Sequence, residues 1–382
     1  TANGYIANLM RAIDQYGSQG DAERLLRHLG YTGRYPPETS EQTMSMNLTK
    51  LSNAEYPLRD AREAIDGDNA LNPATNGNYT ATGNPPGYWI GKGAELVGGK
   101  VGTTASSKTV RELINERRNP SNGQYLGDVK LVEGDNGEAP VAGFDLTTRQ
   151  PKSISILWAF GDKETRDGID ECMRRATEMT IEYFEKEYAT TRAGQGGVAS
   201  VSADGVAGFV FDHYDSRDGD PQPHEHVVLS NRVRFADKVW TALDGRKIYA
   251  SLVEISEVHE NLLQDLLTER FGWSWTLRQD TGTKAVVNEV EDAAGIIDAF
   301  SGRHAEIAKL VEEKIKEEER QTGKEVGPKR KAQIDLEVWR NTRKAKPAVQ
   351  PSLQAKREHW YHKLGEVAPD IQLDQMMKGR EL

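Results

Sequence analysis

Residues 211–231 read FDHYDSRDGDPQPHEHVVLSN, and the rest of the chain is organised around them. The apolar runs at 206–211 and 227–229 are typical of buried strands. Between them, Asp-Gly-Asp-Pro at 218–221 is a turn signal. The stretch therefore predicts two antiparallel strands joined as a hairpin.

This stretch holds three of the chain's eight histidines within fourteen residues. Side chains alternate along a strand, so His224 and His226 leave the same face. A hairpin brings His213 towards them. Three neutral imidazoles with an open position suit a catalytic divalent cation better than a closed structural site. Spacing alone leaves a plainer alternative, in which the histidines are close together by coincidence on an exposed strand.

Composition indicates a globular protein of one large domain or two domains, because 382 residues with 37% hydrophobic content can bury a substantial core. No apolar run approaches the roughly 20 residues that span a bilayer, so we expect no membrane insertion. The N-terminus lacks a basic-then-apolar signal pattern. Cys172 is the single cysteine, which excludes an internal disulfide and makes a reducing cytoplasm the default.

The net charge of −10 argues only weakly against a nucleic-acid partner, because charge is unevenly distributed. Residues 324–346 contain eight Lys or Arg against three acids. A local basic region of this kind can follow a phosphate backbone although the whole chain is acidic.

The histidine stretch resembles the metal motif of the MobF-type conjugative relaxases, the TrwC/TraI relaxase-domain family of the HUH endonucleases. The residues that fit this motif without a gap are His213, Ser216, Arg217, Asp220, Pro221, His224, His226 and Asn231. The family usually has a small polar residue between its paired histidines. This chain has Glu225 there, and we expect that carboxylate to change the charge beside the metal.

A second block, Trp89-Ile-Gly-Lys-Gly-Ala-Glu-Leu-Val-Gly98, resembles the family's Trp-x-Gly-x-Gly-Ala-x-x-Leu-Gly segment. The family's nucleophilic tyrosine lies about ten residues before the tryptophan, where this chain has Tyr79 in a loop rich in Asn, Gly, Pro and Thr. The resemblance thus implies Tyr79 as the nucleophile. Many members use a second tyrosine, for which Tyr56 and Tyr88 are the candidates here, and a single-tyrosine cycle is the alternative.

A third block, Asp145-Leu-Thr-Thr-Arg-Gln-Pro-Lys-Ser-Ile-Ser155, resembles the family's Asp-Leu-Thr-x-x-x-Pro-Lys-Ser-Val-Ser segment. The resemblance implies that Asp145 lies beside the metal, where it takes the tyrosine proton or orients an imidazole. An Asp paired with a nearby Arg at a strand end is the plain alternative. Candidate contacts with DNA phosphates are Lys92, Lys152 and Arg217.

Periodicity predicts strands at 46–52 and 153–160, and helices at 163–188 and 250–270, with mostly helical sequence beyond 290. This order indicates an α+β fold. The resemblance implies a palm-like antiparallel five-stranded sheet flanked by helices, with a helical C-terminal clamp. We accordingly expect a helical N-terminal extension at 1–45, a catalytic domain at 46–290 and a helical DNA-clamping extension at 291–382.

The resemblance implies nicking of single-stranded transfer-origin DNA by transesterification, which leaves a 5′-phosphotyrosine and permits later religation. The expected cofactor is a divalent cation: Mg, Mn or Zn. Expected partners are transfer-origin DNA with an adjacent hairpin, relaxosome accessory proteins and a type IV coupling protein. The expected location is the bacterial cytoplasm, with transfer to the recipient cell alongside the DNA.

Three alternatives remain open from the sequence. A rolling-circle replication initiator would use the same chemistry on a different DNA site. A metal-dependent nuclease would use activated water and would not need Tyr79. A metal-stabilised DNA-binding module would bind a transfer-origin hairpin without cutting it.

Overall fold

The computed structural model describes residues 46–60, 84–128, 140–216, 218–236, 239–278, 287–290, 294–342 and 351–367. The predicted extension at 1–45 and two predicted site residues, Tyr79 and Arg217, lie outside these ranges. Among the described residues, no helix is both long and apolar enough to cross a membrane.

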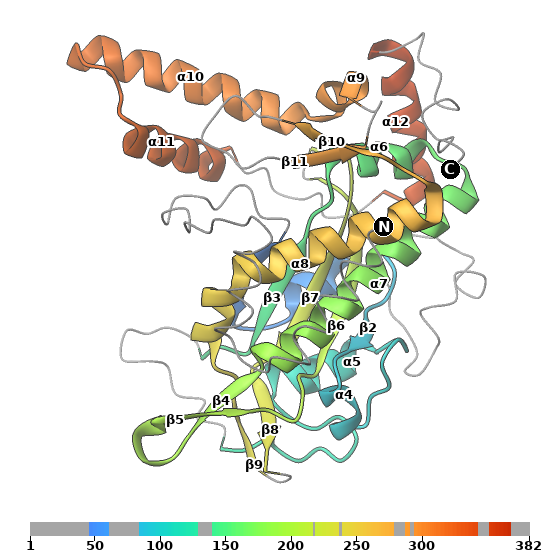
Figure 1. Cartoon of the computed structure of the whole chain (residues 1–382), viewed down its shortest axis with the longest axis vertical. Helices are drawn as coiled ribbons and strands as arrows, with labels where there is room; N and C mark the ends of the chain where they lie inside the picture. Colours follow the sequence, from blue (N-terminus) through green and yellow to red (C-terminus); the bar gives the residue numbers. More distant parts are fainter. Residues whose placement is uncertain are drawn as a thin grey trace, which may run out of the picture.

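A five-stranded antiparallel sheet forms the centre of the fold, in the order β1-β3-β7-β6-β2 (Figure 1). Its strands are β1 (Met46–Leu51), β2 (Tyr88–Ile90), β3 (Gly143–Thr148), β6 (Gly208–Asp215) and β7 (Pro221–Ser230). The predicted α+β fold with a five-stranded sheet is confirmed. Because β6 and β7 both lie inside the sheet, the predicted histidine hairpin is hydrogen-bonded to a neighbouring strand on each side.

Two long helices cover one face of the sheet and lie side by side across it, α7 (Lys163–Glu187) and α8 (Gly245–Phe271) (Figure 1). Helix α7 buries a stripe of side chains that runs from Ile169 through Ala176 to Phe184. Asp162 caps the start of α7 by accepting a hydrogen bond from the Thr165 backbone N–H at 2.8 Å.

The remaining elements before residue 300 are short. They are α3 (Glu55–Asp60), α4 (Gly93–Leu96), α5 (Ser107–Val110), the π-helix η1 (Arg111–Asn115), α6 (Lys152–Phe160), β4 (Thr190–Ala193), the 3-10 helix η2 (Gln195–Gly197), β5 (Ala199–Ser202), β8 (Arg232–Phe235), β9 (Val239–Ala242), β10 (Trp275–Arg278), β11 (Val287–Val290), α9 (Ala294–Ile297) and the 3-10 helix η3 (Asp298–Phe300). Three pairs form small antiparallel ribbons outside the main sheet: β4–β5, β8–β9 and β10–β11.

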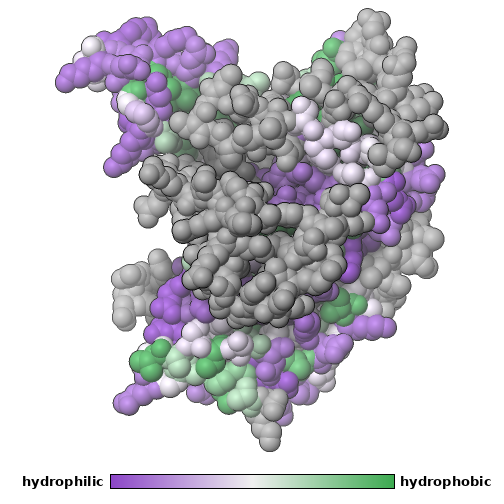
Figure 2. All heavy atoms as spheres, in the orientation of Figure 1, coloured by the Kyte–Doolittle hydropathy of each residue, from purple (hydrophilic) through white to green (hydrophobic). Residues whose placement is uncertain are grey.

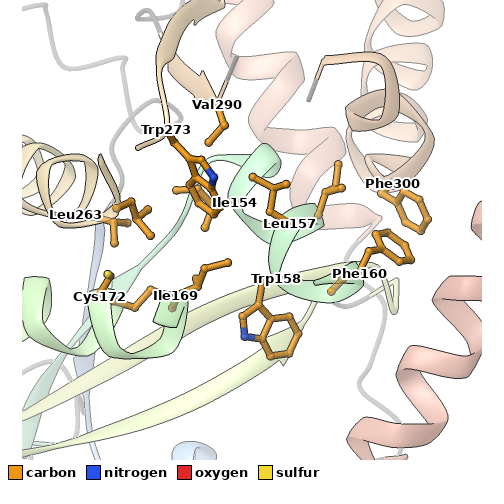
Figure 3. Packing of buried hydrophobic residues seen from close by; sticks show 14 of the residues in the cluster. Ile154, Leu157, Trp158, Phe160, Ile169, Cys172, Leu263, Trp273, Val290 and Phe300 are labelled. Carbon is orange, nitrogen blue, oxygen red and sulfur yellow. The ribbon is translucent and has the colours of Figure 1, made fainter. Parts of the chain in front are cut away.

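The strand predicted at 153–160 is wrong, because this segment is helix α6. Its Ser-Ile-Ser-Ile start alternates like a strand, but every side chain from Ser153 to Phe160 is buried. A segment enclosed on all sides has no polar face, so its pattern does not distinguish helix from strand. Figure 3 shows its apolar side chains packed among residues of α7, α8, β11 and η3, with Cys172 in the same cluster.

The described residues after 293 lie mostly in helices, as the sequence predicts. α10 (Gly302–Thr322) and α11 (Pro328–Asn341) form a hairpin that extends from the body (Figure 1), and we call it the α10–α11 arm. The arm has its own small cluster around Val326, Ile334 and Val338, and Figure 2 shows a mostly hydrophilic outer surface on it. α12 (Leu353–Val367) instead contributes Trp360 and Leu364 to the main core.

Candidate metal centre and active site

The metal-motif histidines lie on the β6–β7 hairpin, as the sequence predicts. The strand register pairs His213 with His224 and Phe211 with His226, which puts all three imidazoles on one face. The turn is closed between Ser216 and Asp220: the Ser216 N–H donates to the Asp220 carbonyl at 2.8 Å, and the Asp220 N–H donates to Ser216 Oγ at 3.2 Å. Gly219 adopts φ 80°, a conformation that favours glycine.

The three imidazoles converge. Their ring centroids are 4.7 Å apart for His213 and His226, 5.2 Å for His213 and His224, and 5.3 Å for His224 and His226. One nitrogen from each ring falls within 4.8 Å of the other two. His213 and His226 are buried and His224 is half-buried, which leaves the cluster open on one side.

Hydrogen bonds to Nδ1 make two of these rings suitable metal ligands. His226 Nδ1 lies 2.8 Å from Asp145 Oδ2, and His224 Nδ1 lies 2.7 Å from the Gln222 carbonyl oxygen. A carboxylate and a carbonyl both accept, so Nδ1 carries the proton in each ring and Nε2 keeps its lone pair. Metal-binding histidines are oriented by contacts of this kind. The donor set therefore fits a divalent cation.

Asp145 lies beside the three histidines, as the resemblance implies. It belongs to β3, is 5% exposed and is positioned opposite Val228 of β7. Thr147, two residues along the same strand, has its hydroxyl 3.4 Å from Asp145 Oδ1 and 3.2 Å from His226 Nδ1. The hydrogen bond between Asp145 and His226 favours the role of this carboxylate in orienting the imidazole over direct acceptance of the tyrosine proton.

The expectation that Glu225 changes the charge beside the metal is wrong. Glu225 alternates with the histidines, so its side chain leaves the opposite face of the sheet, where it is 2% exposed. There it accepts hydrogen bonds from the Tyr88 phenol at 3.3 Å and from the Thr177 hydroxyl. The carboxyl is thus separated from the metal cluster by the sheet itself.

A cluster of acids occupies this reverse face. The register sets Asp212 opposite Glu225, and Asp170 and Arg174 approach from α7 around a small cavity that they line together. Burial raises the pKa of each carboxyl, to about 7 for Asp170, and the Asp212 carboxylate raises the pKa of Glu225 further. Three carboxyls share one guanidinium, so burial and mutual repulsion both favour their neutral forms.

The two candidate second tyrosines lie on opposite faces of the sheet. Tyr88 is buried on the reverse face, where burial and then the Glu225 charge raise its pKa well above the usual range. Tyr56 instead lies edge-on to the His226 ring at 5.8 Å between centroids. Of the two candidate second tyrosines, only Tyr56 is on the metal side. No spacing in the sequence distinguished it from Tyr88.

The start of α3, which carries Tyr56, is held by the π-helix η1. The Ala54 backbone N–H donates to Asn115 Oδ1 at 2.7 Å, and Arg111 donates two hydrogen bonds to the Glu55 carboxylate. π-Helical turns occur frequently at functional sites. Here η1 fixes the helix that brings a phenol to the metal cluster.

The two described candidates for DNA contact lie in different places. Lys152 is at the turn of the histidine hairpin, where its ammonium donates to the Pro221 carbonyl at 2.7 Å and burial lowers its pKa to about 8. Lys92 is exposed at the start of α4, and the next residue, Gly93, donates to the Val206 carbonyl near the start of β6. His213 is towards the other end of that strand, so the structure does not bring Lys92 to the metal cluster.

An antiparallel five-stranded sheet whose central hairpin carries three convergent histidines, one of them backed by a carboxylate, is the arrangement that the resemblance to the HUH endonucleases implies. The model of the TrwC relaxase family matches residues 52–367, and the chain belongs to this family. The family expected from the three sequence blocks is confirmed.

Relatives and solved structures agree with this membership. The chain is 26% identical over 306 residues to the multifunctional conjugation protein TraI of Escherichia coli K12, and 27% identical over 281 residues to another Escherichia coli TraI. These matches cover 77% and 70% of this chain but only 15% of each TraI.

The solved structures share the fold. Copper-bound conjugative relaxase TrwC in complex with OriT DNA has a TM-score of 0.60 at 22% identity, covering 86% of this chain and 99% of that one. TrwC complexed with a 27-mer DNA comprising the recognition hairpin and the cleavage site has a TM-score of 0.57 at 22% identity, with the same coverage.

Proposed function

We propose that this chain is a conjugative DNA relaxase that nicks one strand of a transfer origin and holds a divalent cation on His213, His224 and His226. The observation that supports this most directly is the convergence of the three imidazoles, with Asp145 behind one of them, in a chain of the TrwC relaxase family. When the cation is bound, it supplies positive charge that polarises the scissile phosphate.

The proposed substrate is single-stranded transfer-origin DNA with an adjacent hairpin. This proposal follows from the family and from the TrwC structures, which contain OriT DNA with a recognition hairpin and a cleavage site. Relaxosome accessory proteins and a type IV coupling protein are proposed as partners, and the bacterial cytoplasm as the location, on the family membership alone. Transfer to the recipient with the DNA belongs to the same proposal.

The proposed reaction is an in-line transesterification. The Tyr79 phenol oxygen attacks phosphorus and gives its proton to water, the bond from phosphorus to the 3′ oxygen breaks, and that oxygen takes up a proton from water. The products are a 5′-phosphotyrosine and a free 3′-hydroxyl, and the reverse reaction religates the strand. The unperturbed pKa of tyrosine is about 10, so the phenol needs activation at neutral pH. Asp145 holds His226 in the tautomer that leaves Nε2 free for the cation.

Tyr79 is proposed from its distance to Trp89 in the sequence, and Tyr56 is the second candidate because its ring lies against His226. Either tyrosine would give the same products. If both worked, two consecutive transesterifications would be possible on one chain. If neither were needed, activated water would be the nucleophile.

Covalent capture tests these roles. The chain and its Tyr79→Phe and Tyr56→Phe variants are incubated with labelled single-stranded transfer-origin DNA and Mn²⁺, and adducts are resolved on denaturing gels and mapped by peptide mass. Tyr125→Phe is the matched control, because Tyr125 is 51% exposed and its phenol contacts Arg118 rather than the metal cluster. Replacing all three histidines by Ala tests the requirement for the metal centre.

We expect an adduct on Tyr79 that is absent from Tyr79→Phe, unchanged in the control and lost in the triple histidine variant. An adduct on Tyr56 would keep the class and transfer the nucleophile. Cleavage without any adduct would contradict the proposal and favour a hydrolase. Hairpin binding without cleavage would favour a DNA-binding module, and full activity of the triple histidine variant would exclude the metal centre.

A further inference from the structure

One face of α12 is directed at the turn of the histidine hairpin. Lys356, Trp360 and Lys363 are spaced four and then three residues apart, so they lie on the same side of the helix. Each of them makes a polar contact with a different position of the segment between Asp215 and Asp220. Their partners are about 140 residues away in the sequence, and no local pattern indicates the pairing.

The three contacts are short and largely protected from water. Lys356 Nζ lies 2.8 Å from Asp215 Oδ1, and these side chains are 7% and 14% exposed. Lys363 Nζ lies 2.6 Å from Asp220 Oδ1, with exposures of 27% and 8%. Between them, the indole N–H of Trp360, which is fully buried, donates to the Gly219 carbonyl at 2.6 Å. Ion pairs this well buried are expensive to break by removing one partner.

The turn that α12 holds is the connection between the metal-ligand strands. Asp215 is two residues after His213, and Asp220 is four residues before His224. A hairpin end exposed to solvent would be among the first places to open locally. A metal site, by contrast, requires its ligands to be held within about 0.5 Å of their working positions. Ordering the turn therefore bears directly on the spacing of His213 and His224.

Two further groups converge on the same turn. The Gly302 backbone N–H at the start of α10 lies 3.2 Å from Asp220 Oδ2, and Lys152 of α6 donates to the Pro221 carbonyl. Asp220 thus joins the start of the α10–α11 arm to α12, the helix that follows the arm in the chain.

We propose that α12 is a positioning element for the metal centre, in which Lys356, Trp360 and Lys363 fix the turn so that His213 and His224 stay at ligand distance. The inference rests on the proposed metal centre and assigns part of its cation affinity to a helix that supplies no ligand. Coupling of this kind is reciprocal, so a bound cation also stabilises the docking of α12.

The test measures Mn²⁺ affinity of the full chain by titration calorimetry, without DNA, in Lys363→Met and Lys356→Met. The matched control is Lys314→Met, which removes an ion pair with Glu337 inside the α10–α11 arm, away from the turn. Lys363→Arg keeps the charge and serves as the conservative variant. Thermal unfolding of each variant without cation reports any general loss of stability.

We expect cation binding about 10-fold weaker in both α12 variants, the size of effect that groups orienting metal ligands usually have, and recovery of most of it in Lys363→Arg. Lys314→Met should bind like the wild type. In wild-type chain, Mn²⁺ should slow amide hydrogen exchange in α12 but leave exchange in α11 unchanged.

Cation affinities equal to that of the control would overturn the proposal, and so would lower melting temperatures with unchanged affinity, since α12 would then only pack against the body. If Lys363→Met does not fold, Lys356→Met and the hydrogen-exchange experiment decide the question. Absence of cation binding in the wild type would instead defeat the proposed metal centre, so the two failures are distinguishable.

Discussion

The β6–β7 hairpin presents three imidazoles on one face and, one residue out of phase, the carboxyls of Asp212 and Glu225 on the other. Both faces carry polar side chains, and the partners of these side chains differ between the faces. On the imidazole face, the Asp145 carboxylate and the Gln222 carbonyl accept hydrogen bonds from His226 and His224 and orient these two rings as ligands. The carboxyls lie near the Arg174 guanidinium. Glu225 accepts hydrogen bonds from the hydroxyls of Tyr88 and Thr177, and burial raises its pKa.

The difference shows how one strand pair can serve two purposes. On the imidazole face His224 is half-buried and one nitrogen of each ring lies within 4.8 Å of the other two, which suits a cation that must also contact substrate. The carboxyl face lies against α7, which brings Arg174 close to the acids, and this suits a support for the strands. Substitutions on the two faces should therefore have different consequences.

The largest effect is expected behind the imidazoles. Asp145→Ala leaves His226 Nδ1 without its carboxylate acceptor, so cation affinity should fall by about 10- to 100-fold and nicking should require correspondingly more Mn²⁺. Titration calorimetry and nicking against Mn²⁺ concentration measure this. Asp204→Ala removes a surface carboxylate paired with Arg234 and should change neither. Unchanged affinity in Asp145→Ala would show that Asp145 does not orient His226.

A smaller effect is expected from His259 of α8, which shares the Thr177 hydroxyl with Glu225. Burial lowers the pKa of His259 to about 4. As the pH is lowered from 6.5 to 4, the unfolded chain binds a proton that the folded chain does not, so the free energy of unfolding decreases. At pH 5 the loss is about 2 kcal/mol, and His259→Gln should abolish it. Urea unfolding from pH 5 to 7.5 measures the difference, with the exposed His362→Gln as control. Equal pH slopes in wild type and His259→Gln would contradict the assignment.

The smallest effect is expected at Glu225. Burial raises the pKa of its carboxyl, which points away from the cation, and Glu225→Gln replaces this carboxyl by a neutral group of the same shape. Mn²⁺ affinity should stay within about twofold of wild type, because a neutral amide still bonds Tyr88 and Thr177. A tenfold change in affinity would place the charge of Glu225 beside the metal after all.

Local patterns in the sequence predicted the hairpin and its metal ligands. The turn residues and the two-residue period are properties of adjacent positions, and they suffice to put His213, His224 and His226 together. The same period also directs Glu225 to the other face, so its correct placement was available from the sequence alone. The expectation about its charge is wrong because adjacent side chains on a strand leave opposite faces, so Glu225 is next to the histidines in the sequence but not in space.

Other features depended on contacts between distant parts of the chain. Helix α6 looked like a strand because its side chains are all buried, and its Ser153 hydroxyl bonds Glu289, which no local pattern indicates. Tyr56 reaches His226 only because η1 holds α3 in place. The ion pair between Lys356 and Asp215 likewise depends on how α12 returns to the body.

Cys172, the chain's single cysteine, lies in the cluster around α6 next to Ile169 and Leu263 (Figure 3). Burial raises the pKa of its thiol to about 12, so almost none is present as the thiolate that reacts with maleimides. A cysteine introduced at Lys316, on the exposed side of α10, would then be the chain's single reactive thiol. The fold thus provides a clean background for fluorescence labelling, in which one dye on the α10–α11 arm reports its distance from labelled DNA without removal of the native cysteine.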